Sequence, residues 1–225
     1  EPLGPILGIM PWNFPVWQVI RFAIPALLLG NTILLKHAPS TFGVAERLAD
    51  LFLQALPFSV YINLPIDVGL VPGIISDFGV RGVSLTGSRQ AGAHVAGLAG
   101  QNLKKTVLEL GGSDAYVVLD DADLDLAVSV CIRSRLMNAG QSCVAAKRFI
   151  VTAKNQRAFT EAMVEKMRAE KFGPPLLESS QIGPLARRDL RDHLHAQVQK
   201  SIQQGAKPLL GCEVPQQKGF YYPPS

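Results

Sequence analysis

Four short segments of the chain combine residue types that can carry out chemistry. The first is MNAGQSCVAAKR, residues 137–148, in which a Gly-Gln-Ser turn precedes Cys143. A cysteine thiolate is a strong nucleophile, and small neighbouring residues let a ligand approach it closely. An isolated cysteine is more often a small core residue than a nucleophile, so catalysis at Cys143 needs support from elsewhere in the chain.

The second segment, VLELGG, places Glu109 between two leucines at a strand end, immediately before two glycines. A carboxylate among apolar residues holds its proton more tightly than in water, which suits a general base working near neutral pH. The alternative is that Glu109 faces solvent on a strand with alternating polarity.

Two further segments offer hydrogen-bond donors. In PWNFP, residues 11–15, two prolines bracket a rigid turn from which the Asn13 amide could donate to an oxyanion. In LTGSRQAG, residues 85–92, Gly87 and Ser88 stand at the head of a predicted helix, where free backbone N–H groups can bind a phosphate. Ordinary turn chemistry explains the first segment equally well, and the second is not a GxGxxG motif.

These residues must be positioned by strands and helices that alternate along the chain, which favours an α/β fold with parallel sheets and flanking helices. Gly111 and Gly112 mark a crossing between two domains, 1–109 and 110–225. We expect strands near 4–10, 32–35, 59–65, 107–110, 115–119 and 148–151, and a strand, tight turn and helix start within 82–92. We expect helices near 16–29, 42–56, 120–137, 155–170 and 185–204.

The composition is that of a globular protein. Of 225 residues, 48% are hydrophobic and 18% charged, with a net charge of +4 and no long basic run, so we expect no nucleic-acid partner. The most apolar stretch, 19–35, is broken by Arg21, Pro25 and Gly30, so we expect no membrane span. Three cysteines argue against a disulfide framework and favour a reducing, cytoplasmic location.

Two features that could suggest a metal site do not support one. His193 and His195 are two residues apart on a predicted helix and therefore face different directions. The aspartates of residues 120–125 lack the glycine of a calcium loop and instead suit an acidic helix start. We predict no metal.

Together the segments resemble the aldehyde dehydrogenase family. IMPWNFP, LLK ending at Lys36, LTGS, VLELGG, NAGQSC and IGPL at 182–185 occur in that family's order and spacing, over essentially the whole chain. The resemblance implies a nucleotide-binding domain over 1–109 and a catalytic domain over 110–225, both incomplete. We therefore expect an internal piece of a longer protein that forms a homo-oligomer.

The resemblance also implies a mechanism. Cys143 attacks the aldehyde carbon, and the Asn13 amide and the Cys143 backbone N–H hold the resulting oxyanion. A hydride passes to the nicotinamide, and Glu109 activates the water that hydrolyses the thioester. Lys147 and Arg148 have no role in this scheme and are expected to be ordinary flanking charges.

The cofactor implied is NAD or NADP. By resemblance, Lys36 contacts the adenosine ribose and Gly87-Ser88 meets the pyrophosphate. NAD-preferring relatives often carry a glutamate where this chain has Pro39, so NADP stays open. The residues expected to line the cofactor cleft are Ile9, Met10, Pro11 and Trp12.

The expected substrate is a small aldehyde bound by Phe14, Trp17 and Arg21, which with Gln18 share a face of the helix after Asn13. An arginine in an apolar tunnel suggests a substrate carboxylate. Arg21 stands where succinate-semialdehyde dehydrogenases carry such an arginine, and residues 8–39 are most similar to that family's bacterial branch. Met137 replaces a second arginine found in some of those enzymes, and the alternative role for Arg21 is a salt bridge to a residue in the missing segments of the full-length protein.

Three other functions stay open at this point. The protein could oxidise another small aldehyde, or transfer the acyl group to CoA, although CoA-acylating branches tend to lack the glutamate base. It could also be a non-catalytic, dinucleotide-binding fragment. The presence of Cys143, Glu109 and Asn13 together disfavours a decayed site.

Overall fold

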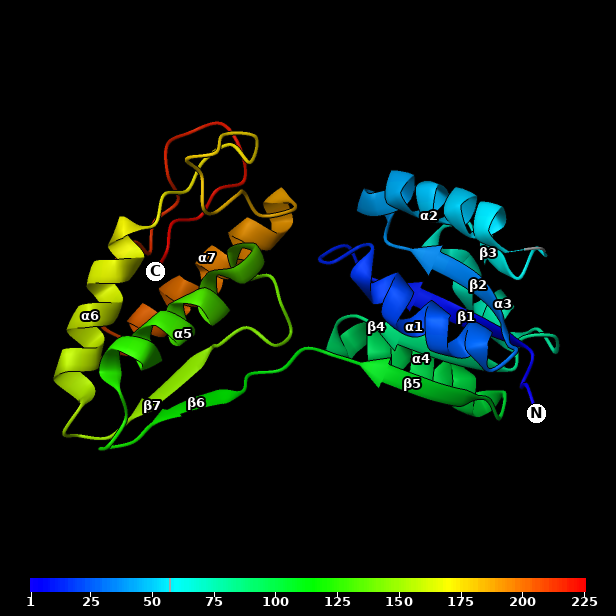
Figure 1. The fold of residues 1–225 in the computed structure, drawn as a ribbon, viewed down its shortest axis with the longest axis horizontal. Coiled ribbons are helices and arrows are strands. Elements are labelled where there is room, and N and C mark those ends of the chain that lie inside the picture. The colour runs from blue at the N-terminus through cyan, green and yellow to red at the C-terminus, as the bar shows by residue number, and fades with distance from the viewer. Residues whose placement is uncertain (57) are drawn as a thin grey trace. The chain divides into compact units, whose positions relative to one another are not determined.

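The computed structural model describes residues 1–56 and 58–225, which form two compact units, Glu1–Gly111 and Gly112–Ser225 (Figure 1). Helices alternate with parallel strands in both units. The predicted α/β class with parallel sheets and flanking helices is therefore confirmed.

The first unit is built on a five-stranded parallel sheet. Its strands are β1 (Pro5–Met10), β2 (Thr32–His37), β3 (Tyr61–Asn63), β4 (Gly82–Thr86) and β5 (Lys105–Glu109), in the order β3-β2-β1-β4-β5. The chain moves outward from β1 to β3 and then returns to the other side of β1 with β4. Open α/β sheets bind ligands where the strand order reverses in this way, which here is at the carboxyl ends of β1 and β4.

Four helices cover this sheet on its two faces (Figure 1). One core holds α1 (Trp17–Leu28) and α2 (Phe42–Ala55) against strand residues such as Ile33 and Leu35. The other holds α3 (Val71–Ser76) and α4 (Arg89–Gln101) against Leu7 and Val83. Helix α3 was not predicted, because six residues are too few to display a helical period of apolar positions.

The second unit contains a two-stranded parallel sheet of β6 (Ala115–Val118) and β7 (Arg148–Val151). Helices α5 (Leu124–Leu136) and α6 (Gln156–Ala169) pack together on it around Val128, Phe159 and Met163. Helix α7 (Arg188–Gln203) follows and buries no residue fully. The predicted acidic helix start is confirmed, since the Asp123 carboxylate caps α5 by accepting from the Leu126 N–H at 3.0 Å.

Two features are absent from the described residues, 1–56 and 58–225. None of their helices is long and apolar enough to cross a membrane. Among them there is also no group of three or more His, Cys, Asp and Glu side chains that could hold a metal ion.

Candidate active site

The first unit gathers its predicted site residues at the carboxyl edge of the sheet. Asn13 follows the end of β1, and Ser88 follows the end of β4. Glu109 ends β5, pairs with Thr86 of β4, and accepts a hydrogen bond from the Gly87 N–H to its backbone oxygen at 2.9 Å. Strand register alone therefore brings the expected oxyanion donor, phosphate contact and general base to one edge.

A cavity of about 420 Å³ borders this edge, on the side of β4 and β5 that faces α1. Its lining is mostly apolar, and its charged residues are Arg21, Lys105 and Glu109. The Arg21 guanidinium lies 3.7 Å from the Glu109 carboxylate, so the expected carboxylate anchor and the expected base form an ion pair.

The prediction that apolar residues surround the Glu109 carboxylate is wrong for this unit. Its side chain is 52% exposed, and it lies among a cation and solvent instead of being enclosed by apolar groups. The reason is that β5 is an edge strand on which every second residue is exposed, which is the alternative arrangement for this strand. Arg21 pairs with Glu109 within the chain, so the alternative of a salt bridge to a residue outside this sequence stays untested.

The residues predicted to share one face of α1 differ in how exposed they are. Trp17 is 60% exposed and Arg21 has 38% of its side chain exposed, whereas Gln18 is buried. Phe14 precedes the helix, and its backbone oxygen accepts from the Gln18 N–H at 3.0 Å. Gln18 therefore belongs to the interior of the unit, although its side chain borders the cavity.

His37, at the end of β2, holds the turn that carries Asn13. Its Nδ1 accepts from the Ala38 N–H at 2.8 Å, which leaves the proton on Nε2 to be donated to the Pro15 carbonyl oxygen at 2.9 Å. Burial lowers the pKa of His37, so the ring stays neutral. No role for His37 was predicted, because a histidine at a strand end has many structural uses.

Ser88 is the N-cap of α4, where its side-chain oxygen accepts from the Ala91 N–H at 3.2 Å. The first backbone N–H groups of the helix have no acceptor within the helix itself. The first turn of α4, after Ser88, therefore presents donors near the carboxyl end of β4, as an anion site requires, whereas the Gly87 N–H is already bonded to the Glu109 oxygen.

Lys36 is a buried cation at the same edge, on the strand next to β1. Only 4% of the residue is exposed. Burial lowers the pKa of its ammonium group, and the attraction of Asp67 offsets part of that effect. In the part of the chain that the structure describes, Lys36 makes no hydrogen bond or ion pair, so a polar ligand could supply its missing partner.

The four residues expected to line the cofactor cleft differ in access. Met10 is buried in the core against α1, so only its backbone is available to a ligand. Ile9 points to the opposite face of the sheet, where it packs near α4. Pro11 and Trp12 lie beyond the strand end and are half-buried.

In the second unit, Cys143 lies on an irregular turn between α5 and β7. Asn138, Ala139 and Gly140 all have positive φ values, 52°, 54° and 76°, which reverse the chain after the helix. Beyond Cys143, the Ala146 N–H donates to the Ser134 hydroxyl at 3.1 Å. The turn is thus fixed to α5 after the partly exposed cysteine.

Lys147 and Arg148 were wrongly treated as ordinary flanking charges. The Lys147 Nζ donates to the backbone oxygens of Ser142 and Cys143 at 3.0 and 2.8 Å. The Arg148 Nε donates to the Ser113 oxygen at 2.8 Å. The only signal available in the sequence was the position of a lysine four residues after Cys143, close enough to fold back on it.

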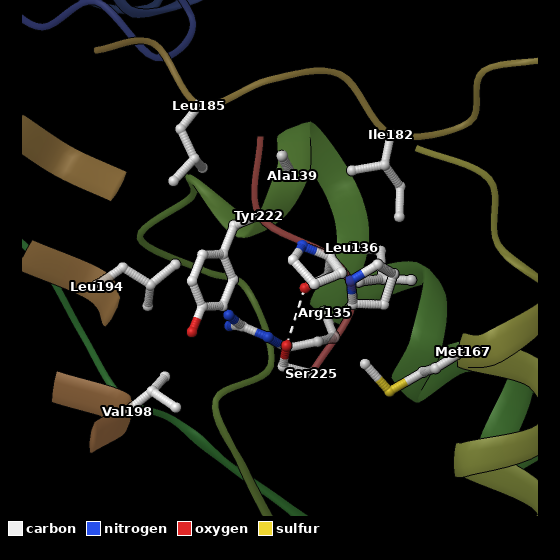
Figure 2. A pocket seen from close by; sticks show the side chains of 12 residues that line it. Arg135, Leu136, Ala139, Met167, Ile182, Leu185, Leu194, Val198, Tyr222 and Ser225 are labelled. Carbon is white, nitrogen blue, oxygen red and sulfur yellow. Dashed lines mark hydrogen bonds between the residues drawn. The ribbon is translucent and has the colours of Figure 1, made fainter. Parts of the chain in front are cut away.

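Figure 2 shows a second cavity, of about 110 Å³, in which Arg135 and Tyr222 are the largest polar side chains. Burial lowers the pKa of Arg135, whose guanidinium donates to the Ala146 oxygen at 3.3 Å. None of the residues that line it was predicted to have a catalytic or binding role, and its volume suits a few water molecules.

Comparison with known proteins agrees with this geometry. The sequence profile of the aldehyde dehydrogenase family matches residues 1–225. The chain is 51% identical to the succinate semialdehyde dehydrogenase [NAD(P)+] Sad of Escherichia coli K12, and the match covers all of this chain and 49% of the relative. It is 46% identical to a probable succinate-semialdehyde dehydrogenase [NADP(+)] of Synechocystis, with 50% of that protein covered.

A solved structure gives the same result in three dimensions. The succinic semialdehyde dehydrogenase of Streptococcus pyogenes, in complex with NADP+, superposes with a TM-score of 0.95 at 38% identity, covering 98% of this chain and 49% of that one. The chain therefore spans about half the length of the relatives it matches. With a family profile that matches every residue, the chain belongs to the aldehyde dehydrogenase family.

Proposed function

We propose that the full-length protein oxidises succinate semialdehyde to succinate with NAD or NADP. The observation that carries the proposal is the arrangement of Asn13, Ser88 and Glu109 at one sheet edge, with Arg21 beside Glu109. The relatives named as succinate semialdehyde dehydrogenases support the choice of substrate.

The first unit fits a dinucleotide. Its strand order reverses between β1 and β4, and the start of α4, with its free backbone donors, follows the end of β4 at that point. Lys36 offers a buried ammonium group that a ribose hydroxyl or phosphate could satisfy. No carboxylate follows at Pro39 to repel a 2′-phosphate, so both NAD and NADP remain in the proposal.

Cys143 would act as the nucleophile. Its thiolate sulfur bonds to the aldehyde carbon, and the oxygen becomes an oxyanion held by the Asn13 amide and the Cys143 N–H. NAD or NADP, when bound, would supply the hydride acceptor, and Cys143 would then carry the acyl group as a thioester on its sulfur.

Glu109 would complete the reaction as general base. It takes a proton from a water molecule whose oxygen attacks the thioester carbon. The carbon–sulfur bond then breaks, which releases the carboxylic acid and regenerates the Cys143 thiolate. A half-exposed carboxylate can reach solvent water, so the exposure of Glu109 is compatible with this role.

Arg21 would bind the substrate carboxylate. Its pairing with Glu109 at 3.7 Å is long for a charge-assisted hydrogen bond, and both side chains are partly exposed, so the pair contributes little stability. A substrate carboxylate could therefore replace Glu109 as the partner of Arg21, which would free the base to bind water.

The experiment compares two four-carbon aldehydes, succinate semialdehyde and butanal, as substrates of the full-length protein with NAD or NADP. Only succinate semialdehyde carries a carboxylate. We expect Arg21→Met to lower kcat/KM about 100-fold for succinate semialdehyde and little for butanal. Arg47→Met is the matched control, because Arg47 forms an exposed ion pair with Asp50 on α2.

The outcomes separate the remaining functions. Equal loss on both aldehydes would make Arg21 a structural residue and leave the substrate as another aldehyde. Thioester transfer to added CoA in preference to hydrolysis would indicate the CoA-acylating reaction. Dinucleotide binding without turnover of either aldehyde would favour a non-catalytic protein.

A further inference from the structure

Lys147 makes an unusual contact with the turn that carries Cys143. Its single Nζ atom donates to two successive backbone oxygens, those of Ser142 at 3.0 Å and Cys143 at 2.8 Å. The Ala145 N–H also donates to the Ser142 oxygen, at 3.3 Å. The two carbonyl groups next to the cysteine Cα therefore converge on one cation.

The directions of the neighbouring N–H groups follow from peptide geometry. The peptide bonds of the described residues are trans, so the C=O and N–H of one peptide point in opposite directions. The Ser142 carbonyl shares its peptide with the Cys143 N–H, and the Cys143 carbonyl shares its peptide with the Val144 N–H. Because both oxygens point at Lys147, both N–H groups point to the opposite side of the turn.

The Cys143 N–H is available to a ligand. Among residues 1–56 and 58–225 it donates to no acceptor. Successive N–H groups that point the same way form a concave site for an anion. A cation bonded to the oxygen of a peptide also polarises that peptide, which strengthens its N–H as a donor.

We propose that Lys147 is a positioning residue that orients and polarises the Cys143 peptide, so that its N–H can hold the oxyanion formed at the substrate carbon. This inference rests on the proposed function, because it takes Cys143 as the nucleophile. A lysine suits the task, since one compact ammonium group with three donors can serve two oxygens at once, whereas the donors of arginine are spread over a planar fork.

The test uses an acyl transfer that needs no dinucleotide. Para-nitrophenyl acetate acylates a nucleophilic cysteine through an oxyanion and releases coloured nitrophenolate. Iodoacetamide alkylates the same thiol without forming an oxyanion. The ratio of the two rates in the full-length protein therefore separates the oxyanion site from the reactivity and access of the thiol.

Lys147→Met should slow the acylation of Cys143 about tenfold, a smaller loss than for complete removal of an oxyanion donor, and change its alkylation less than twofold. Lys147→Arg should recover part of the acylation rate. The matched control is Lys154→Met, because the Lys154 Nζ also donates to a backbone oxygen, that of Asp120 at 3.2 Å, in a turn of the same unit. It should leave both rates unchanged.

Three results would overturn the inference: acylation of the Lys147→Met protein at the original rate, parallel losses of acylation and alkylation, or no acylation of Cys143 in the unaltered protein. A different result would show that the proposed function is wrong while the role of Lys147 holds. In that case acylation would still depend on Lys147, but no aldehyde would reduce the dinucleotide.

Discussion

The two units of the chain position their candidate residues by different means. In the first, Asn13, Ser88 and Glu109 stand where parallel strands end, so regular backbone hydrogen bonds set their spacing. In the second, Cys143 stands on a turn with three left-handed residues, fixed by contacts from Ser134 and Lys147. Strand register thus supplies the donors and the base, while individual side chains hold the nucleophile.

This difference predicts where substitutions act. Changing a side chain at the sheet edge should remove one chemical role and leave the strands in place, because the strands are held by backbone bonds and two cores. Changing a side chain around the Cys143 turn should alter the geometry of the turn, because no ladder of backbone bonds replaces the lost contact.

The largest effect is expected at Glu109. Glu109→Gln should lower the steady-state rate about 1,000-fold, since the amide cannot take a proton from water. Because β5 is held by backbone pairing with β4, the thermal midpoint of the protein should stay nearly unchanged. Steady-state dinucleotide reduction and differential scanning calorimetry measure the two quantities.

Rapid-mixing kinetics show which step of the reaction needs Glu109, because they resolve the first turnover from later ones. The first turnover of Glu109→Gln should still reduce one dinucleotide per Cys143, because the base acts only after hydride transfer. Loss of that first turnover would instead assign Glu109 to an earlier step.

The next effect is expected at Lys36. Lys36→Met should weaken dinucleotide binding about tenfold and stabilise the ligand-free protein by about 1 kcal/mol, because it removes a charge on a largely buried side chain whose desolvation lowers its pKa. Fluorescence titration and thermal unfolding without ligand test both parts. Lower stability in the variant would show that Lys36 supports the fold, contrary to its placement as a ligand contact.

A smaller effect, which depends on pH, is expected at His37. Burial holds its folded-state pKa below the ordinary value of 6.5. The unfolded chain therefore takes up the proton first as the pH falls, so the folded protein should lose stability below pH 6.5 until its own pKa is reached. The slope for one proton is at most about 1.4 kcal/mol per pH unit.

Thermal midpoints at pH 7.5 and 5.5 measure this effect. His37→Gln should show a smaller difference between the two midpoints, and His94→Gln should behave as the unaltered protein, since His94 is exposed on α4. Identical differences in all three proteins would contradict the neutral, buried state of His37.

The smallest effect is expected in the Cys143 turn. Ala139 has a φ of 54°, so Ala139→Gly should stabilise the protein by about 0.5–1 kcal/mol through relief of backbone strain. Gly140→Ala should do the opposite, because its φ is 76° and a Cβ there would lie 3.0 Å from the Arg135 guanidinium. Thermal unfolding of both variants gives the sign; a loss in Ala139→Gly would refute the strain argument.

Much of the fold could be predicted from the sequence because the chain alternates apolar strands with amphipathic helices. Prolines and glycines also mark where the strands end, which allowed Asn13, Gly87 and Glu109 to be placed at strand ends. The Arg21–Glu109 pair could not be predicted, because it depends on how α1 lies over the edge strand. The contacts of Lys147 depend on the path of an irregular turn, which has no periodic signature in the sequence.

Trapping the covalent intermediate tests the central claim most directly. The full-length Glu109→Gln protein is mixed with succinate semialdehyde and NADP or NAD, quenched in acid, digested and analysed by mass spectrometry. The account predicts one succinyl group as a thioester on the peptide that contains Cys143, formed only when the dinucleotide is present. A succinyl group on Cys131 or Cys212, or none while aldehyde oxidation continues, would contradict it.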